Sequence, residues 1–272
     1  MQIGKLSAGH DGKFRLKKHA PDDTFGVSKG DAEKSLVRQV ADLQDLHELL
    51  YAENRRALLI VLQGMDAAGK DGTIKHVMSG VNPQGCAVTS FKQPSAIELA
   101  HDFLWRIHAA VPAKGAIGIF NRSHYEDVLI ARVHKLAPKP VWQARYGEIN
   151  AFEEMLSENG VHIVKFFLHI SKAEQERRFE ERLNDKNKNW KASAADFKER
   201  QFWDDYQTAY EDAIAKCSTK RAPWYVIPSD HKWFRNFAVA EIVIQTLHSL
   251  KMKFPKVDAA ELAHLSSEPA KT

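Results

Sequence analysis

An apolar run that leads directly into a glycine-rich turn constrains the fold of this chain more than any other feature. Residues 57–62 read Ala-Leu-Leu-Ile-Val-Leu, which is typical of a strand buried on both faces. The turn that follows has the spacing G-x-x-x-x-G-K, with Gly64, Gly69 and Lys70 at its fixed positions. Glycines at this spacing let backbone N–H groups converge on one anion, and the next helix adds its positive end. The sequence therefore predicts a phosphate-binding loop between a strand and a helix.

Four further apolar runs follow the same pattern, and helical segments separate them. The runs span residues 87–91, 116–120, 162–168 and 224–227. Before the first strand, helical spacing is carried by Leu36, Val40, Leu43, Leu46 and Leu50. Strands that alternate with helices favour a parallel sheet with helices on both faces. We therefore expect an α/β fold, a three-layer sandwich with a parallel sheet.

The length of 272 residues suits a single domain with an inserted lid. We expect residues 1–30 to form a basic arm, residues 171–222 to leave the sheet as a helical lid, and residues 256–272 to form a frayed tail. The longest aliphatic run, residues 58–62, is far shorter than the roughly 20 residues of a membrane span. The N-terminal residues lack the apolar core of a secretory signal, and two cysteines are too few for a disulfide scaffold. We expect a cytoplasmic protein with no membrane partner.

The position after Lys70 departs from the usual motif. A Ser or Thr normally stands there and binds Mg²⁺ through its hydroxyl, whereas this chain has Asp71. Thr73 cannot replace it, because two residues further along a helix lie about 200° around the axis. The third apolar run also ends in Asn121 instead of the usual aspartate. Phosphate chemistry needs a hard cation held by oxygen ligands, so other carboxylates must supply them.

Three carboxylates are candidates for this metal site. Asp66 lies within the loop, and Glu126 and Asp127 lie about one helical turn beyond the third run. Each has a purely structural alternative. Asp66 can shape the turn, Glu126 can cap a helix that begins after Ser123, and Asp127 can complement a helix dipole.

Basic side chains are the third component of the candidate site. Arg122 follows the third strand, at the edge where α/β proteins bind ligands, and its planar guanidinium suits phosphate. Arg177, Arg178 and Arg182 share one predicted helix of the lid, where they either close on a substrate or form a solvated face with neighbouring glutamates. The net charge of +4 permits an anionic partner without requiring one.

Three segments in order resemble the polyphosphate kinase 2 family. They are residues 64–73 (Gly-Met-Asp-Ala-Ala-Gly-Lys-Asp-Gly-Thr), 120–127 (Phe-Asn-Arg-Ser-His-Tyr-Glu-Asp) and 228–236 (Pro-Ser-Asp-His-Lys-Trp-Phe-Arg-Asn), and the resemblance covers about residues 30–250. It implies a P-loop kinase fold similar to thymidylate kinase, with a lid over the site. It also implies transfer of the terminal phosphoryl of inorganic polyphosphate to a nucleotide with Mg²⁺, or Mn²⁺ as the alternative ion. The expected assembly is a homo-oligomer, a dimer or a tetramer.

The resemblance also implies roles for individual residues. Asp66 is expected to be the principal metal ligand and Asp127 its helper, while Glu126 serves a second metal ion or the acceptor phosphate. The expected catalytic residues are Asp66, Lys70, Arg122, Glu126 and Asp127. The expected substrate-binding residues are Gly64, Ala67, Ala68, Gly69, Asp71, Gly72, Thr73, Lys75, Asn121, Arg132, Arg177, Arg178, Lys232 and Arg235.

Asn121 and the Glu126-Asp127 pair resemble the subgroup that phosphorylates both AMP and ADP. We expect adenine nucleotides as acceptors, with guanine as an alternative base, and no nucleic-acid partner. The expected mechanism is direct in-line transfer without a covalent intermediate, because a nucleotide phosphate is already ionised near neutral pH. Two other functions stay open: an ATP-dependent nucleoside monophosphate kinase on the same fold, and a non-catalytic protein that binds polyphosphate or nucleic acid.

Overall fold

The computed structural model describes residues 3–187, 189–191 and 194–256. A five-stranded parallel sheet lies at its centre, with the strand order β2-β3-β1-β4-β5. Its strands are β1 (Ala57–Gln63), β2 (Cys86–Ser90), β3 (Ile117–Asn121), β4 (Val161–His169) and β5 (Trp224–Pro228). Each of the five apolar runs forms a strand whose ends lie within one residue of the prediction. The predicted α/β class with a parallel sheet is therefore confirmed.

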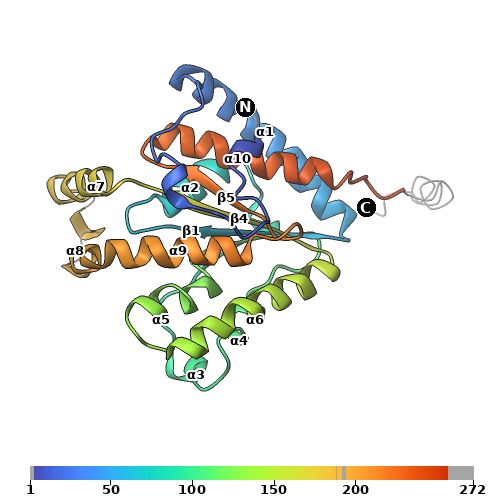
Figure 1. Ribbon diagram of the computed structural model, residues 1–272. Helices are drawn as coiled ribbons and strands as arrows, with labels where there is room; N and C mark the ends of the chain where they lie inside the picture. Colours follow the sequence, from blue (N-terminus) through green and yellow to red (C-terminus); the bar gives the residue numbers. More distant parts are fainter. Residues whose placement is uncertain (1–2, 188, 192–193, 257–272) are drawn as a thin grey trace, which may run out of the picture.

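Helices cover both faces of this sheet (Figure 1). On one face lie α1 (Lys29–Glu53), α2 (Lys70–Val77) and α10 (Lys232–Ser249), and on the other lie α6 (Lys139–Glu158) and α9 (Trp203–Cys217). All seven residues of β1 are buried, as expected for the central strand of a sheet that is covered twice. The three-layer sandwich was predicted correctly.

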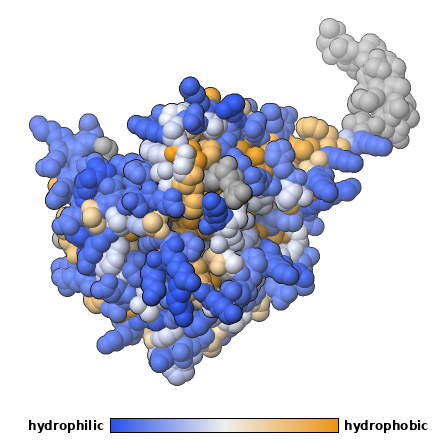
Figure 2. Space-filling model, turned by 45° about the horizontal axis from the view of Figure 1, so that its top comes forward, coloured by the Kyte–Doolittle hydropathy of each residue, from blue (hydrophilic) through white to orange (hydrophobic). Residues whose placement is uncertain are grey.

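The described residues also form further helices and 3₁₀ turns outside these layers. The remaining α-helices are α3 (Ala96–Leu99), α4 (Trp105–His108), α5 (Ile130–Val133), α7 (Lys172–Asn184) and α8 (Ala194–Glu199). The 3₁₀ turns are η1 (Ile3–Lys5), η2 (Leu16–Lys18), η3 (Pro83–Gly85), η4 (His124–Asp127), η5 (Asn189–Lys191) and η6 (Arg200–Phe202). Hydrophilic residues cover most of the face seen in Figure 2. Among the described residues, no helix combines the length and the apolar character that a membrane span requires.

The N-terminal segment packs against the sheet, so the expectation of a free basic arm is wrong for its described part. Leu6, Phe14 and Leu16 are all buried in the core. The segment also bonds to the edge strand β5, where the Val226 amide donates to the Leu6 carbonyl and the Ala8 amide donates to the Trp224 carbonyl. The apolar residues are too widely spaced among charged ones to produce a helix or strand period, which explains the missed packing.

The helical excursion is shorter than predicted. In Figure 1, α7 and α8 project beyond the end of the sheet, whereas α9 runs along the sheet face. Along α9, Tyr206, Ala209, Tyr210 and Ile214 are buried in the core. The lid is therefore the described part of residues 172–202, and residues 203–222 of the predicted excursion belong to the sandwich. The predicted frayed tail, apart from Lys256, lies outside the described residues.

Candidate active site

The predicted phosphate-binding loop (P-loop, residues 64–70) connects the carboxyl end of β1 to α2. Gly64 and Gly69 have φ values of +155° and +106°, a region that side chains rarely adopt. A Cβ atom on Gly69 would also lie 1.8 Å from Nη1 of Arg235. Both motif glycines are therefore required by the backbone and its neighbours, as the spacing predicted.

Lys70 is the first residue of α2, and its side chain folds back over the P-loop. Its Nζ donates to the Gly64 carbonyl at 2.7 Å. Burial lowers the pKa of Lys70, and the charge of Arg122 lowers it further, while Asp66 and Glu126 act in the opposite direction. The Lys70 amino group thus lies at the start of α2, where it interacts electrostatically with Arg122, Asp66 and Glu126.

A cleft of about 680 Å³ opens over the P-loop. Eleven of the predicted site residues line it: Asp66, Ala67, Gly69, Lys70, Asp71, Gly72, Asn121, Arg122, Arg178, Lys232 and Arg235. The other lining residues are Arg182, which the sequence placed on the predicted lid helix, and seven that it did not single out: His76, Ser90, Phe91, Lys92, Glu181, Trp190 and Asn236. Seven of the lining residues are Lys or Arg and three are Asp or Glu, so the cleft suits a polyanion.

Asp66 and Arg122 join the P-loop to the end of β3. Nη2 of Arg122 donates to Oδ1 of Asp66 at 3.0 Å. Arg122 has a left-handed backbone with φ of +62°, and its amide donates to the Leu62 carbonyl on β1. Burial alone would lower the pKa of Arg122, but Glu126 and Asp66 outweigh it and raise the pKa. The guanidinium is therefore a permanent cation at the cleft.

Asn121 and Asp71 form a second link across the cleft. Nδ2 of Asn121 donates to Oδ1 of Asp71 at 2.7 Å. Asp71 stands where the usual motif has its metal-binding hydroxyl, and Asn121 stands where a strand-end aspartate is usual. The two departures from the motif are thus direct partners. Thr73 is buried and donates to the Gly69 carbonyl, as expected for a residue that cannot replace the missing hydroxyl.

Glu126 and Asp127 are adjacent in η4 but have different surroundings. Burial raises the pKa of Glu126, while Arg122 and Lys70 lower it and Asp66 raises it. Glu126 therefore interacts electrostatically with charged residues in and beside the P-loop. Asp127 instead accepts from Nη1 of Arg145 at 3.1 Å. Neither carboxylate is among the cleft-lining residues, but only Glu126 is electrostatically coupled to Lys70. The arrangement favours Glu126 over Asp127 as the helper of Asp66.

The capping alternative for Glu126 is not supported by the hydrogen bonds of Ser123. The Ser123 hydroxyl accepts from the Tyr125 amide, and the Glu126 amide donates to the Ser123 carbonyl. A capping box would instead pair the Ser123 hydroxyl with the Glu126 amide. Glu126 therefore does not form a capping box with Ser123.

A buried ion pair holds η4 in place from behind. Nζ of Lys165 on β4 pairs with Glu153 of α6 and donates to the Tyr125 hydroxyl at 2.7 Å. Oε1 of Glu153 accepts from that hydroxyl at 2.9 Å and lies 3.1 Å from Nε2 of His124. All four side chains are at most 2% exposed. Two of the four residues of η4 are thus fixed to the core, next to Glu126.

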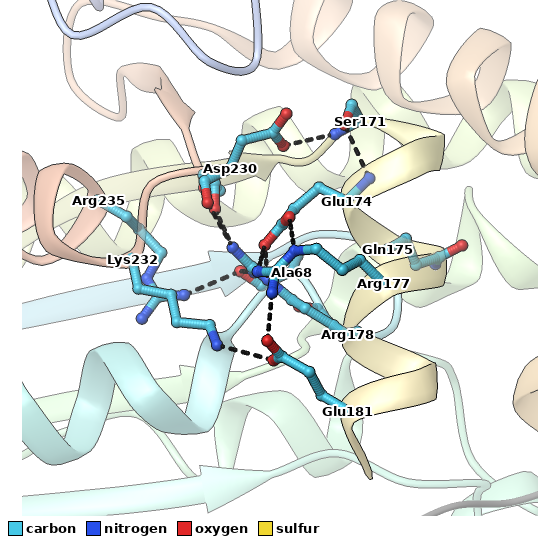
Figure 3. A network of polar contacts seen from close by, with 12 residues as sticks. Ala68, Ser171, Glu174, Gln175, Arg177, Arg178, Glu181, Asp230, Lys232 and Arg235 are labelled. Atoms are coloured by element: carbon cyan, nitrogen blue, oxygen red, sulfur yellow. Dashed lines mark hydrogen bonds and ion pairs between the residues drawn. The ribbon is translucent and has the colours of Figure 1, made fainter. Parts of the chain in front are cut away.

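Two neighbouring arginines of α7, Arg177 and Arg178, differ in exposure, and Figure 3 shows their partners. Arg178 is buried, and its guanidinium donates to Glu174 and to backbone carbonyls of the P-loop and the β5–α10 loop. Arg177 is half exposed and pairs with Glu174 and Glu181. Arg177 does not line the cleft.

The remaining predicted site residues lie away from the cleft surface. Arg132 donates to Asp212 of α9 at 2.7 Å and stacks on the Trp142 ring at 4.5 Å. Lys75 is exposed on α2, one residue before the cleft-lining His76. Gly64 and Ala68 contribute backbone carbonyls to Lys70 and to Arg178 rather than cleft surface. The structure thus does not place Arg132 or Lys75 with the cleft residues.

One missed cleft residue, Lys92, carried a readable signal, and the lid arginine Arg182 that the sequence named also lines the cleft. Lys92 follows the carboxyl end of β2, the same edge of the sheet as the P-loop and Arg122. Arg182 lies four residues after Arg178 on α7, and side chains at this spacing share one helix face. Trp190 of η5 also lines the cleft, but nothing in its local sequence marks it.

The donor set fits a magnesium-type ion. Within the described residues, no group of three or more His, Cys, Asp or Glu side chains could hold a metal by itself. Mg²⁺ is commonly bound through one or two carboxylates together with phosphate oxygens and water. Asp66 and Glu126, which influence each other electrostatically, match that pattern of few protein ligands and hard oxygen donors.

Comparison with known proteins agrees with the three sequence motifs. Residues 26–255 match the family model described as Polyphosphate kinase 2. The chain is 52% identical over 252 residues to the AMP/ADP-polyphosphate phosphotransferase of Meiothermus ruber, across 92% of this chain and 94% of that protein. It is 49% identical over 255 residues to the ADP-polyphosphate phosphotransferase of Rhodopseudomonas palustris, across 89% of this chain and 88% of that protein.

A solved structure agrees as well. The crystal structure of polyphosphate kinase 2 from Arthrobacter aurescens TC1 matches with a TM-score of 0.92 and 44% identity, across 97% of this chain and 96% of that chain. The predicted P-loop kinase fold is confirmed by this match and by the parallel sheet. The chain is therefore a member of the polyphosphate kinase 2 family.

Proposed function

We propose that the protein transfers the terminal phosphoryl group of inorganic polyphosphate to AMP and to ADP. The printed names of the two relatives, at 52% and 49% identity over most of the chain, support this donor and these acceptors. The transfer is reversible in principle, so concentrations decide its direction.

One observation carries the proposal beyond family membership. The cleft surrounds the P-loop with an excess of cations, and the Asn121–Asp71 pair occupies both positions that hold Mg²⁺ in the usual ATP-binding motif. An ATP-dependent monophosphate kinase on this fold would need those positions for its own metal. Transfer from a long phosphate chain does not need those two positions if Asp66 and Glu126 hold the metal instead.

The residues act in the transfer by position and charge. The acceptor's terminal phosphate oxygen attacks the end phosphorus of polyphosphate, the new P–O bond forms, and the bond to the shortened chain breaks. Lys70 and Arg122 stabilise the charge on the transferred group and on the leaving chain. No proton needs to be removed, because the acceptor phosphate is already ionised near neutral pH.

Asp66 and Glu126 are the residues that would hold the metal. When bound there, Mg²⁺, or Mn²⁺ as the alternative, supplies charge neutralisation for the phosphate oxygens. We also propose that Gly64, Thr73, Lys75, Arg132 and Arg177 act outside direct substrate contact, because none of them lines the cleft.

The wider setting is proposed from the sequence. We propose a cytoplasmic homo-oligomer that acts as a single domain, uses adenine nucleotides, and accepts guanine nucleotides as an alternative. Size-exclusion chromatography with light scattering measures the assembly directly.

A matrix of donors and acceptors tests the proposed function. Polyphosphate or ATP is supplied with AMP, ADP, GMP or GDP, with Mg²⁺ or with EDTA, and products are separated by ion-exchange chromatography. We expect ADP and ATP from AMP and polyphosphate in the absence of any added ATP, and no product with EDTA. Product from AMP only when ATP is the donor would support the monophosphate kinase instead. Polyphosphate binding without turnover would support a non-catalytic binding protein.

A further inference from the structure

We infer that Gln175 and Arg178 of α7, together with Arg235 of α10, are positioning residues that orient the backbone amides of the P-loop toward the phosphate chain. The inference rests on the proposed function, because it takes the ligand of the P-loop to be a phosphate chain. On this inference, the first two turns of α7 are a fixed support of the P-loop and not part of a moving lid.

Gln175 holds the first of three consecutive P-loop carbonyls. Its Nε2 donates to the Asp66 carbonyl at 2.9 Å, and the residue is 1% exposed. Its buried Oε1 has no hydrogen-bond partner among the described residues. Burying an amide group with one unpaired atom costs free energy. The cost suggests that the other hydrogen bond of Gln175, to the Asp66 carbonyl, has a function.

Two buried guanidinium groups hold the next two carbonyls (Figure 3). Nη1 of Arg178 donates to the carbonyls of Ala67 at 2.9 Å and Ala68 at 3.2 Å, and Nη1 of Arg235 donates to the Ala68 carbonyl at 3.1 Å. Both arginines are at most 4% exposed. Burial and the neighbouring charge of Arg178 lower the pKa of Arg235 to about 9, so two like charges are held together at one short stretch of backbone.

The planarity of the peptide bond converts these contacts into an orientation of the amides. The C=O and N–H of a trans peptide point in opposite directions, so anchoring the carbonyls of Asp66 and Ala68 turns the amides of Ala67 and Gly69 the other way. Both of these residues line the cleft. Their amides make no hydrogen bond to any described residue, whereas the intervening Ala68 amide donates to the Met65 carbonyl.

The result is a pair of amides directed at the anion by three buried side chains, of which Arg178 and Arg235 also line the cleft. Ala67 adopts a left-handed φ of +62° within this stretch, and successive amides in such turns form anion-binding concavities. The α7 helix is tied down at the same place, because the Ser171 amide donates to Asp230 and Arg178 reaches the Ser229 and Asp230 carbonyls.

The test compares two buried glutamines in the full-length protein. Gln175→Leu removes the donor to Asp66, and Gln39→Leu is the matched control. Gln39 is also buried, donates once from Nε2 to Glu241, and has an unpaired Oε1, but it lies between α1 and α10, away from the cleft residues. Calorimetric binding of tripolyphosphate without nucleotide and kcat/KM for polyphosphate with ADP are measured for both variants and the parent.

We expect Gln175→Leu to weaken tripolyphosphate binding and to lower kcat/KM by about tenfold each, the effect of one misdirected hydrogen bond. Gln39→Leu should stay within about twofold of the parent in both, although it loses a similar buried bond. Unchanged tripolyphosphate binding in Gln175→Leu, or an equal loss in Gln39→Leu, would overturn the inference. Because the binding arm needs no turnover, it decides the inference even if the donor and acceptor matrix rejects the proposed function.

An isosteric variant adds a readout that a general loss of stability would not change. Gln175→Glu places an oxygen where Nε2 was, and this oxygen donates to the Asp66 carbonyl only when protonated. Relative to the parent at each pH, the activity of Gln175→Glu should therefore rise as the pH falls from 8 to 5.5, while that of Gln175→Leu stays flat. Parallel pH profiles for the two variants would contradict the proposed donor role.

Discussion

Arg122 at the end of β3 donates a hydrogen bond to Asp66 in the P-loop across 3.0 Å. The pair brings together two segments that are 56 residues apart in the chain. It also sets the carboxylate expected to hold a metal directly beside a cation that lines the cleft. A metal ion on Asp66 and a phosphate group on Arg122 would therefore bind next to each other.

The first prediction concerns Asp66. Asp66→Asn keeps an oxygen that accepts from Arg122 but removes the negative charge that a metal needs. We expect turnover to fall about a hundredfold or more, as for loss of a central electrostatic group, with the thermal unfolding midpoint within a few degrees of the parent. Initial rates and calorimetric melting measure the two effects. A rate near that of the parent would show that Asp66 is not the principal metal ligand.

The second prediction separates the two adjacent carboxylates of η4. Glu126→Gln should raise the Mg²⁺ concentration needed for half-maximal rate and lower kcat, because Glu126 interacts electrostatically with Lys70, Arg122 and Asp66. Asp127→Asn should leave the Mg²⁺ dependence unchanged, because that carboxylate is engaged by Arg145. Magnesium titrations of both variants decide between them, and the reverse order would restore Asp127 as the helper.

These two carboxylates also show where sequence reasoning reached its limit. The strands, the P-loop and Lys70 follow from local signals, namely apolar runs and glycine spacing. The choice between Glu126 and Asp127 depends instead on how η4 is turned. That orientation is set by contacts of Tyr125 with Lys165 of β4, which lies 40 residues further along the chain.

The surroundings of Arg132 and of the N-terminal segment could not be read from the sequence, for the same physical reason. The family resemblance implied that Arg132 holds phosphate, whereas its guanidinium donates to Asp212, which is 80 residues away and lies on α9. Leu6 was assigned to a free arm, but its carbonyl accepts from Val226 at the opposite end of the chain. Long-range pairing of this kind leaves no periodic pattern in the sequence around either residue.

The third prediction concerns the buried pair behind η4. Burial alone would raise the pKa of Glu153, but Lys165 and His124 hold it below its ordinary value. Lys165→Met leaves that carboxylate buried without its cation, and we expect a loss of about 3–5 kcal/mol in the free energy of unfolding. The double variant Lys165→Met/Glu153→Gln should recover part of this loss. Additive losses in urea unfolding would show that the two side chains are not coupled.

The fourth prediction is a pH dependence of stability. Burial, assisted by the charge of His19, lowers the pKa of His169 to about 4, whereas an unfolded histidine has a pKa of about 6.5. Between these values the unfolded chain binds the extra proton, so stability is present above pH 6.5 and is lost as the pH falls. From pH 6.5 to 5 this group should cost about 2 kcal/mol.

The control for that prediction is an exposed histidine. His169→Gln should reduce the difference in unfolding free energy between pH 7 and pH 5 by about 2 kcal/mol, and His248→Gln on the exposed side of α10 should leave it unchanged. Equal pH dependence in the parent and His169→Gln would mean that His169 titrates alike in both states.

The central claim is that the P-loop cleft transfers a phosphoryl group directly from polyphosphate to the nucleotide. Rapid-quench single turnover with end-labelled ³²P polyphosphate and AMP tests it most directly, in the parent and in Lys70→Ala. We predict that label passes into ADP with no labelled protein at any time in the parent, and that Lys70→Ala, still folded, transfers at least a hundredfold more slowly. A labelled protein that forms and decays at the rate of ADP formation, or an unchanged rate in Lys70→Ala, would contradict it.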